Sequence, residues 1–159
     1  MRLTQWTDYT LRVLMYCAAC QARDQPVTIT EIADSHAISR SHLTKIVHQL
    51  GSQGLLETTR GRGGGMRLSR PAADINVGAV VRQTETDFNM VECFEAASNH
   101  CGLIANCRLK GLLHQATDSY LAVLDAASLA DLIAPTLSLV KAPASRRCAA
   151  TPGIPPAKR

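Results

Sequence analysis

The chain has 159 residues, 46% of them hydrophobic, and a formal net charge of +4. This length suits one domain with a real core and leaves little for a second. No run of eighteen or more apolar residues is present, and the first residues lack the hydrophobic region of a signal peptide, so we expect a cytoplasmic protein. Six cysteines in a reducing compartment are more typical of free, buried or metal-bound thiols than of disulfides.

The modest net charge hides a segregation along the chain. Residues 40–70 hold six lysines and arginines against the single acid Glu57, whereas residues 71–133 hold eight acids against three bases. A positive block beside an acidic one fits a nucleic-acid-binding half joined to a half with another task. Taken alone, the charge pattern has an alternative explanation, in which the charged side chains are simply solvated surface groups.

Three helices are predicted in the first part of the chain. The helical spacing of apolar residues, without Gly or Pro, predicts a helix over residues 5–22. Thr28 and Glu31 have the spacing of a capping box at the start of a shorter second helix. Ser39 is the expected N-cap of a third helix, and a tight turn around His36–Ile38 makes the last two helices a helix-turn-helix.

A β-hairpin is predicted next, from two short strands over 55–59 and 66–68. Glycine supplies the positive φ angles that a hairpin tip needs, and Gly63–Gly65 lie between the strands. Arg60 and Arg62 would make this tip a slim cationic wing suited to a narrow minor groove. The alternative is a merely flexible glycine turn.

The second helix of a helix-turn-helix lies in the major groove, with its N-terminal residues nearest the base edges. In this chain that end carries side chains that can donate to bases or phosphates: Ser39, Arg40, Ser41, His42 and Lys45. A solvated helix face is the alternative, but the adjacent wing favours DNA binding. The predicted fold class is mainly α with a small β-hairpin, with a winged helix-turn-helix domain over residues 1–75.

The second half predicts a short helix capped by Asn76 and a long amphipathic helix over about 108–124. One recognition helix covers few base pairs, so such modules act as symmetric dimers on palindromes, and the long helix is the natural dimerisation helix. Packing inside its own domain is the alternative. Ser128 and Asp131 predict a capped turn ending near Ile133.

The predicted domain division follows from these elements. Residues 1–75 form the DNA-binding domain, and residues 76–133 form the cysteine loop and the dimerisation helix. Residues 134–159 are rich in proline and poor in large apolar side chains, so we expect a disordered tail.

Three cysteines, Cys93, Cys101 and Cys107, lie within fifteen residues with the spacing Cys-x7-Cys-x5-Cys. Thiolates suit zinc and iron–sulfur clusters. Structural zinc sites use close Cys-x2–4-Cys knuckles and four protein ligands, which this segment lacks. An iron–sulfur cluster accepts wider loops and a non-cysteine ligand. Three incidental free thiols remain an alternative, and His100 is disfavoured as a ligand because it abuts Cys101.

Other features argue against redox catalysis or an enzyme. Cys17 and Cys20 form a Cys-x-x-Cys pair, but they are expected deep in the first helix rather than at a helix N-terminus, where thiol pKa values fall. We therefore favour the interpretation of Cys17 and Cys20 as buried small hydrophobic side chains. Cys148, in the tail, is expected to be inert. No nucleophile–base constellation is evident, and the glycine-rich segment lacks the Lys-Ser/Thr ending of a P-loop.

Several motifs carry a family resemblance: Met1-Arg-Leu-Thr, Thr7-Asp8-Tyr9, Leu11-Arg12, Ser39-Arg40-Ser41-His42-Leu43, Arg60-Gly-Arg-Gly-Gly-Gly65, Val80-Val81-Arg82, Cys107-Arg108-Leu109-Lys110 and Leu129-Ala130-Asp131-Leu132. With these motifs, residues 1–133 resemble the winged-helix iron–sulfur transcriptional regulators of the nitric-oxide-sensing repressor (NsrR) type. The tail falls outside the resemblance.

The resemblance implies a homodimer with one iron–sulfur cluster (2Fe-2S or 4Fe-4S) per subunit, held by Cys93, Cys101 and Cys107. In the nitric-oxide branch the fourth ligand is an aspartate of the other subunit, a position that matches Asp8 here. The alternative role of Asp8 is an i to i+4 pair with Arg12 near a helix N-terminus. Both roles are compatible if Arg12 orients the ligand.

The resemblance also implies a repressor that binds a palindromic double-stranded DNA operator and releases it when nitric oxide destroys the cluster. Regulators of cluster assembly in this family place a histidine where this chain has Lys110, which counts against that branch. An iron- or cluster-status-responsive regulator of the same family is the alternative. An electron carrier or a zinc-stabilised interaction module is a rival of another class, disfavoured by the basic wing.

Overall fold

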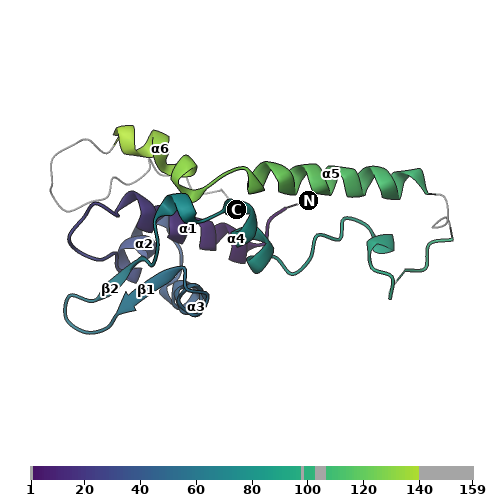
Figure 1. Ribbon diagram of the computed structural model, residues 1–159. Coiled ribbons are helices and arrows are strands. Elements are labelled where there is room, and N and C mark those ends of the chain that lie inside the picture. Colours follow the sequence, from purple (N-terminus) through teal and green to yellow (C-terminus); the bar gives the residue numbers. More distant parts are fainter. Residues whose placement is uncertain (1, 98, 103–106, 140–159) are drawn as a thin grey trace, which may run out of the picture.

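A body of packed helices carries one long arm in the computed structural model (Figure 1), which describes residues 2–97, 99–102 and 107–139. In chain order the elements are α1 (Gln5–Ala19), α2 (Ile29–His36), α3 (Arg40–Ser52), β1 (Leu56–Thr59), β2 (Gly65–Leu68), the 3-10 turn η1 (Ala72–Asp74), α4 (Val77–Thr84), the 3-10 turn η2 (Glu92–Phe94), α5 (Arg108–Asp125) and α6 (Leu129–Leu139). The predicted fold class, mainly α with a small hairpin, is confirmed.

Side-chain caps set the starts of the helices, because the first turn of a helix leaves backbone N–H groups without partners. The capping box of α2 is formed as predicted: Thr28 N donates to Glu31 Oε2 at 2.8 Å, and Glu31 N donates to Thr28 Oγ1 at 3.2 Å. Ser39 accepts from His42 N at the start of α3, and Asn76 accepts from the third residue of α4. These predicted caps are confirmed.

The turn between α2 and α3 lies where the sequence predicts it. Ala37 adopts a left-handed backbone, with φ of +53°, and ends α2, while Ile38 is buried beneath the turn. Helix α1 differs from the prediction, because it ends at Ala19 rather than at residue 22. The chain turns just after Cys20, where Arg23 N donates to the Cys20 carbonyl at 3.0 Å, and this turn directs Arg23 toward α2.

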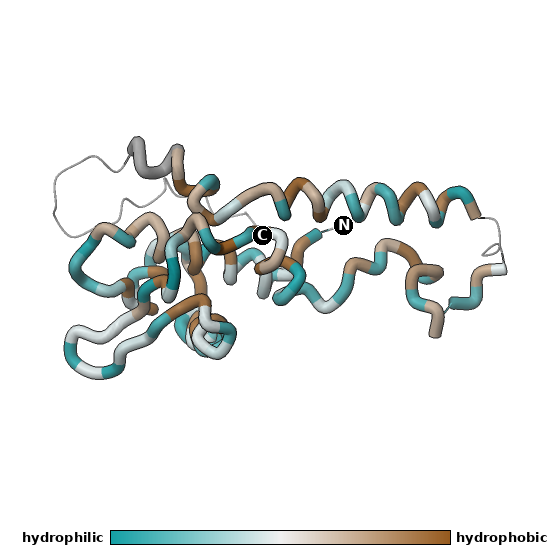
Figure 2. The backbone as a smooth tube through the Cα atoms, in the orientation of Figure 1, coloured by the Kyte–Doolittle hydropathy of each residue, from teal (hydrophilic) through white to brown (hydrophobic). Residues whose placement is uncertain are grey.

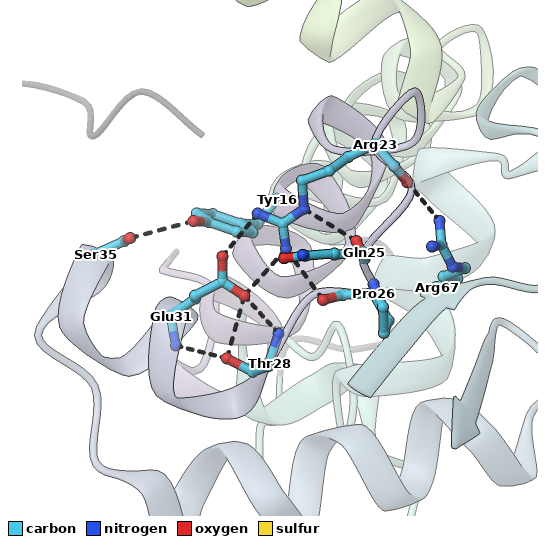
Figure 3. A network of polar contacts seen from close by, with 8 residues as sticks. All are labelled: Tyr16, Arg23, Gln25, Pro26, Thr28, Glu31, Ser35 and Arg67. Atoms are coloured by element: carbon cyan, nitrogen blue, oxygen red, sulfur yellow. Dashed lines mark hydrogen bonds and ion pairs between the residues drawn. The ribbon is translucent and has the colours of Figure 1, made fainter. Parts of the chain in front are cut away.

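Arg23 joins three elements of the body (Figure 3). Its guanidinium donates to both carboxylate oxygens of Glu31, at 2.7 and 3.1 Å, and to the backbone carbonyls of Gln25 and Pro26. Its own carbonyl accepts from Arg67 on β2 at 2.8 Å. The pair with Arg23 lowers the pKa of Glu31 and raises that of the guanidinium. The end of α1, the start of α2 and the hairpin are therefore tied together at one point.

The two strands pair antiparallel, with Leu56 opposite Leu68 and Thr59 opposite Gly65. Met66 also bridges Val27, through N–H to carbonyl bonds of 2.7 and 3.0 Å in the two directions. The hairpin is thereby fixed to the loop before α2. At its tip Gly61 and Gly63 have positive φ angles of 95° and 80°, which the glycine-rich sequence predicts.

The core lies between α1, the helix-turn-helix and α6. Its most buried apolar side chains come from several helices and from the turn before α4: Val13, Leu14, Ile32, Leu43, Ile46, Leu50, Ile75 and Leu129. Helix α6 packs on α1 and on η1, so residues after 128 share the core of the N-terminal region. The division into domains at residues 75 and 133 stays a prediction.

The root of the arm is a close contact between α4 and the end of α5. The Arg82 guanidinium donates to both carboxylate oxygens of Asp125, and Asn76 Nδ2 donates to the Asp125 carbonyl at 2.7 Å. A Cβ added to Gly78 would overlap Asp125 Oδ1 and would lie 2.9 Å from Asp125 N. Gly78 is therefore required for this approach.

The C-terminal region contains one correction. Ser128 and Asp131 cap α6 as predicted, with Ser128 N donating to Asp131 Oδ2 at 2.8 Å. The helix continues to Leu139 rather than ending near Ile133. The expected disorder of the tail stays a prediction. Residues 140–159, with Cys148, lie outside the described part. Within that part, no helix is long and apolar enough to cross a membrane.

Candidate nucleic-acid interface and cysteine arm

The first turn of α3 gathers most of the predicted DNA-contacting side chains at one exposed corner of the body. Ser39, Arg40, Ser41 and Lys45 are all exposed there. Ser39 Oγ lies 3.4 Å from Ser41 Oγ and accepts from the backbone of His42. Exposed hydroxyl and cationic groups at the start of a recognition helix suit contacts to phosphates and base edges.

His42 differs from its neighbours, because its imidazole is half-buried against helix α1. Its ring centroid lies 5.6 Å from that of Trp6 and 5.2 Å from that of Tyr9, the latter in an edge-on arrangement. The structure therefore places His42 between the recognition helix and the first turns of α1.

The predicted wing residues Arg60 and Arg62 are both exposed at the hairpin tip. Arg67 belongs to the same basic block but is used within the fold, since its guanidinium donates to the carbonyls of Arg23 and Asp24. The free cationic groups of the wing are thus concentrated at its tip.

The three cysteines of the predicted cluster lie on the arm, where the chain runs out from α4 and returns along α5 (Figure 1). Cys93 is on η2, and Cys107 directly precedes α5. Phe94 stacks on His114 of α5, with ring centroids 3.9 Å apart and an interplanar angle of 5°. The segment that carries Cys93 is therefore packed on α5.

Cys93, Cys101 and Cys107 are free thiols of intermediate exposure, which suits metal ligation. Among the described residues, no group of three or more His, Cys, Asp or Glu side chains is close enough to hold a metal ion. The chemistry of the donor set fits a thiolate-rich centre, whereas one subunit does not bring three donors together within the described part. Residues 103–106, between the second and third cysteine, lie outside it.

Asp8, the predicted oxygen ligand, lies in the first turn of α1 and not on the arm. Arg12 donates to both its carboxylate oxygens, from Nε at 3.0 Å and from Nη2 at 2.8 Å, so the predicted i to i+4 pair is formed. The carboxylate remains 43% exposed, at the edge of an open depression of about 700 Å³ that also includes Tyr9 and His36. Burial, then the charge of Arg12, lowers the pKa of His36, while Asp8 opposes the shift.

Both residues of the Cys-x-x-Cys pair belong to the core. Cys17 and Cys20 are 3% and 4% exposed. Burial raises the pKa of the Cys17 thiol to about 12, so its thiolate is scarce at neutral pH. The interpretation as a buried small side chain is confirmed for Cys17, a free thiol, whereas Cys20 is buried but takes part in a disulfide.

Several residues that shape these sites are not identifiable from the sequence. Trp6 and Tyr9 fit the apolar stripe of α1, and no local pattern indicates that they contact α3. Glu85, at the end of α4, accepts from Thr4 N at 2.8 Å and from Thr4 Oγ1 at 3.1 Å, and so ties the start of α1 to the root of the arm. These contacts span up to 81 residues of sequence, so only the tertiary fold reveals them.

The helix-turn-helix with its basic hairpin defines a winged-helix DNA-binding protein. A solved structure described as T. potens IscR has the same fold, with a TM-score of 0.68 and 23% identity over 91% of this chain and 94% of that one. The chain belongs to the Rrf2 family, described as iron-dependent transcriptional regulators, whose pattern matches residues 3–135.

Two relatives are similar to this chain over most of their length. The HTH-type transcriptional regulator NsrR of Bacillus subtilis is 50% identical over 133 residues, which cover 84% of this chain and 90% of that protein. The NsrR of Bacillus licheniformis is 49% identical over 133 residues, covering 84% and 92%. The resemblance to NsrR-type regulators is thus confirmed, and the chain is a DNA-binding transcriptional regulator rather than an enzyme.

Proposed function

We propose that the chain is a cytoplasmic homodimeric repressor that binds a palindromic operator while each subunit holds an iron–sulfur cluster, and that nitric oxide releases it. The observation that carries this proposal is the pairing of three free, half-buried thiols on the arm with a DNA-reading corner on the body. Thiolates of this number and spacing suit an iron–sulfur centre. The similarity to regulators named NsrR supports nitric oxide as the signal.

Cys93, Cys101 and Cys107 would hold the cluster, with Asp8 of the partner subunit as fourth ligand. This assignment explains why Asp8 lies on the body rather than on the arm, 43% exposed at an open depression. When bound, the cluster would supply an iron atom whose carboxylate ligand is weaker than a thiolate and is open to nitric oxide. Arg12 already orients the Asp8 carboxylate through two hydrogen bonds.

The energy required for a switch favours ligation between subunits over a surface ion pair. Shifting a DNA-binding equilibrium from mostly bound to mostly free takes about 5 kcal/mol of differential stabilisation. The exposed Asp8–Arg12 pair is worth about 1 kcal/mol or less. Metal–ligand bonds that join the arm of one subunit to the body of the other are a sufficient source.

Ser39, Arg40, Ser41, His42 and Lys45 would face the major groove, and Arg60 and Arg62 the minor groove. Their exposure supports this assignment for all except His42, which packs on α1. Helix α5 would form the dimer interface, since Leu109, Leu112 and Val123 are 58%, 62% and 70% exposed on it. Figure 2 shows hydrophobic and hydrophilic segments alternating along this helix, which runs apart from the body.

An anaerobic gel shift tests the switch. Cluster-loaded protein should bind its operator and lose at least tenfold in affinity after treatment with a nitric oxide donor. Cys101→Ser should remove the cluster and the response, whereas Cys17→Ala, which removes a thiol from the core, should leave both in place. Full operator affinity after nitrosylation would refute the proposal.

Asp8→Asn tests the oxygen ligand. We expect a shorter cluster lifetime in the visible absorbance spectrum and an almost unchanged melting temperature, because an exposed ion pair adds little stability. Asp34→Asn, an exposed carboxylate on α2, is the matched control. An unchanged spectrum and lifetime would remove Asp8 from the ligand set.

A second candidate is an iron- or cluster-status sensor, which the family description as iron-dependent favours. The two functions differ in the signal that releases DNA. Operator release at lower doses of an iron chelator than of nitric oxide would select the sensor of iron status.

A further inference from the structure

We infer that His42 is a positioning residue, which couples the state of Asp8 to the pose of the recognition helix through the rings of Trp6 and Tyr9. This inference rests on the proposed function and deepens it. It assigns His42 a role in transmission, in place of the base or phosphate contact that its position near the start of α3 suggests.

The contact geometry supports this role. His42 is in the first turn of α3, and its backbone N–H donates to the capping Ser39 Oγ at 3.4 Å. Its ring meets Trp6 at 5.6 Å and Tyr9 at 5.2 Å, both on the first turns of α1. The side chain is half-buried in this contact, while the neighbouring Arg40, Ser41 and Lys45 are exposed. A ring held by two others is less available to a base edge than these neighbours are.

The same two turns of α1 carry the proposed cluster ligand. Asp8 accepts from Arg12, and the Arg12 guanidinium lies over the Tyr9 ring, with Cζ 5.9 Å from the centroid. Gln5 Nε2 fixes the Tyr9 hydroxyl at 2.8 Å. A continuous path of contacts therefore runs from Asp8 through Arg12 and Tyr9 to His42 on α3.

Close packing explains how a small change would be transmitted. Packed rings cannot be compressed, so a shift of the first turn of α1 when Asp8 gains or loses a ligand must displace its neighbours. His42 is the α3 side chain in ring contact with this turn. Because it lies within one turn of Arg40 and Ser41, its displacement changes how these side chains meet DNA.

The test compares operator affinity with and without the cluster in four proteins: wild type, His42→Phe, His42→Gln and His48→Ala. His48 is an exposed histidine on the same helix and serves as the control. The measured quantity is the ratio of cluster-loaded to metal-free affinity. We expect His42→Gln to lower this ratio about two- to tenfold, the range expected for lost ring contacts, and His42→Phe and His48→Ala to keep it within about twofold.

The two substitutions at His42 separate the two roles. A glutamine keeps hydrogen-bonding capacity and loses the ring, whereas phenylalanine keeps the ring and loses the hydrogen bonds. If His42 contacted a base, His42→Gln would keep operator affinity. His42→Phe would then lower the cluster-loaded and the metal-free affinity by the same factor. That result would overturn the inference. A wild-type ratio of one would instead refute the proposed switch, and the coupling with it.

A second readout needs neither the cluster nor DNA. Trp6 is the only tryptophan of the chain, so its emission in metal-free protein reports its contact with His42 directly. We expect a red-shifted emission maximum in His42→Gln, because the indole gains exposure, and little change in His48→Ala. Identical emission in wild type and His42→Gln would show that the two rings are not in contact and would overturn the inference.

Discussion

Body and arm use hydrophobic side chains in opposite ways. Leu14 and Leu43 of the body are fully buried, and α1 packs against elements on several sides. On α5, the longest helix described, Thr117 is the one buried residue, while three large apolar side chains are more than half exposed. The body has a core of its own, whereas the arm leaves large apolar side chains exposed, and this is the surface that we propose a second subunit covers.

The ion pairs of the two regions also differ in burial, and we call these two pairs the ionic joints of the body and of the arm. In the body, Arg23 and Glu31 are each about 30% exposed and also bond to backbone groups on both sides. At the root of the arm, Arg82 and Asp125 are each 42% exposed. Water weakens such a pair, so the position of the arm depends more on the close approach at Gly78 than on its charges.

Leu14→Ala in the body and Leu112→Ala in the arm test the difference between the two regions most directly, because the same substitution is made in two helices. Leu14→Ala should lower the free energy of unfolding by about 2–5 kcal/mol through a cavity in the core. Leu112→Ala should change subunit folding little and weaken self-association instead. Chemical denaturation and sedimentation at several protein concentrations measure the two effects. Equal losses of folding stability would show that α5 is packed like the body.

Gly78→Ala and Gly111→Ala test whether the arm is held by a close backbone approach. A methyl group at Gly78 would meet the backbone nitrogen of Asp125 at 2.9 Å, so we expect a loss of about 1–3 kcal/mol. Gly111 lies within α5 with nothing near its added Cβ, so alanine there should stabilise the helix by up to about 1 kcal/mol. Thermal unfolding measures both. Weaker self-association in Gly111→Ala would place the second subunit against that position.

The elements that local chemistry determines were predictable from the sequence. Thr28, Ser39 and Asn76 are caps whose bonds lie within three residues, and the glycines of the wing permit positive φ angles. Element ends were less predictable, because they depend on distant contacts. For example, α1 ends at Ala19, and the turn after it brings Arg23 to Glu31 of α2.

The candidate sites were predictable as residue types but not as arrangements. Spacing indicated three thiolate ligands and a basic corner, whereas the packing of His42 on Trp6 and the stacking of Phe94 on His114 are tertiary contacts without a local pattern. The ligand set remains a prediction, because its proposed fourth member belongs to another subunit.

The smallest expected effect concerns the two ionic joints and their dependence on pH. The hydrogen bond from Arg23 lowers the pKa of Glu31 below its ordinary value of 4.5, so the bond stabilises the folded state fully above that pH and is lost as the pH falls through the lowered pKa. Glu31→Gln should therefore cost about 1 kcal/mol at pH 7, and the difference from wild type should shrink below pH 4.5. Asp125→Asn, at the solvated joint of the arm, should change stability less over the same range. Urea denaturation at fixed protein concentration from pH 3 to pH 7 measures both curves. A constant difference for Glu31→Gln down to pH 3 would mean that Arg23 does not stabilise the ionised carboxylate.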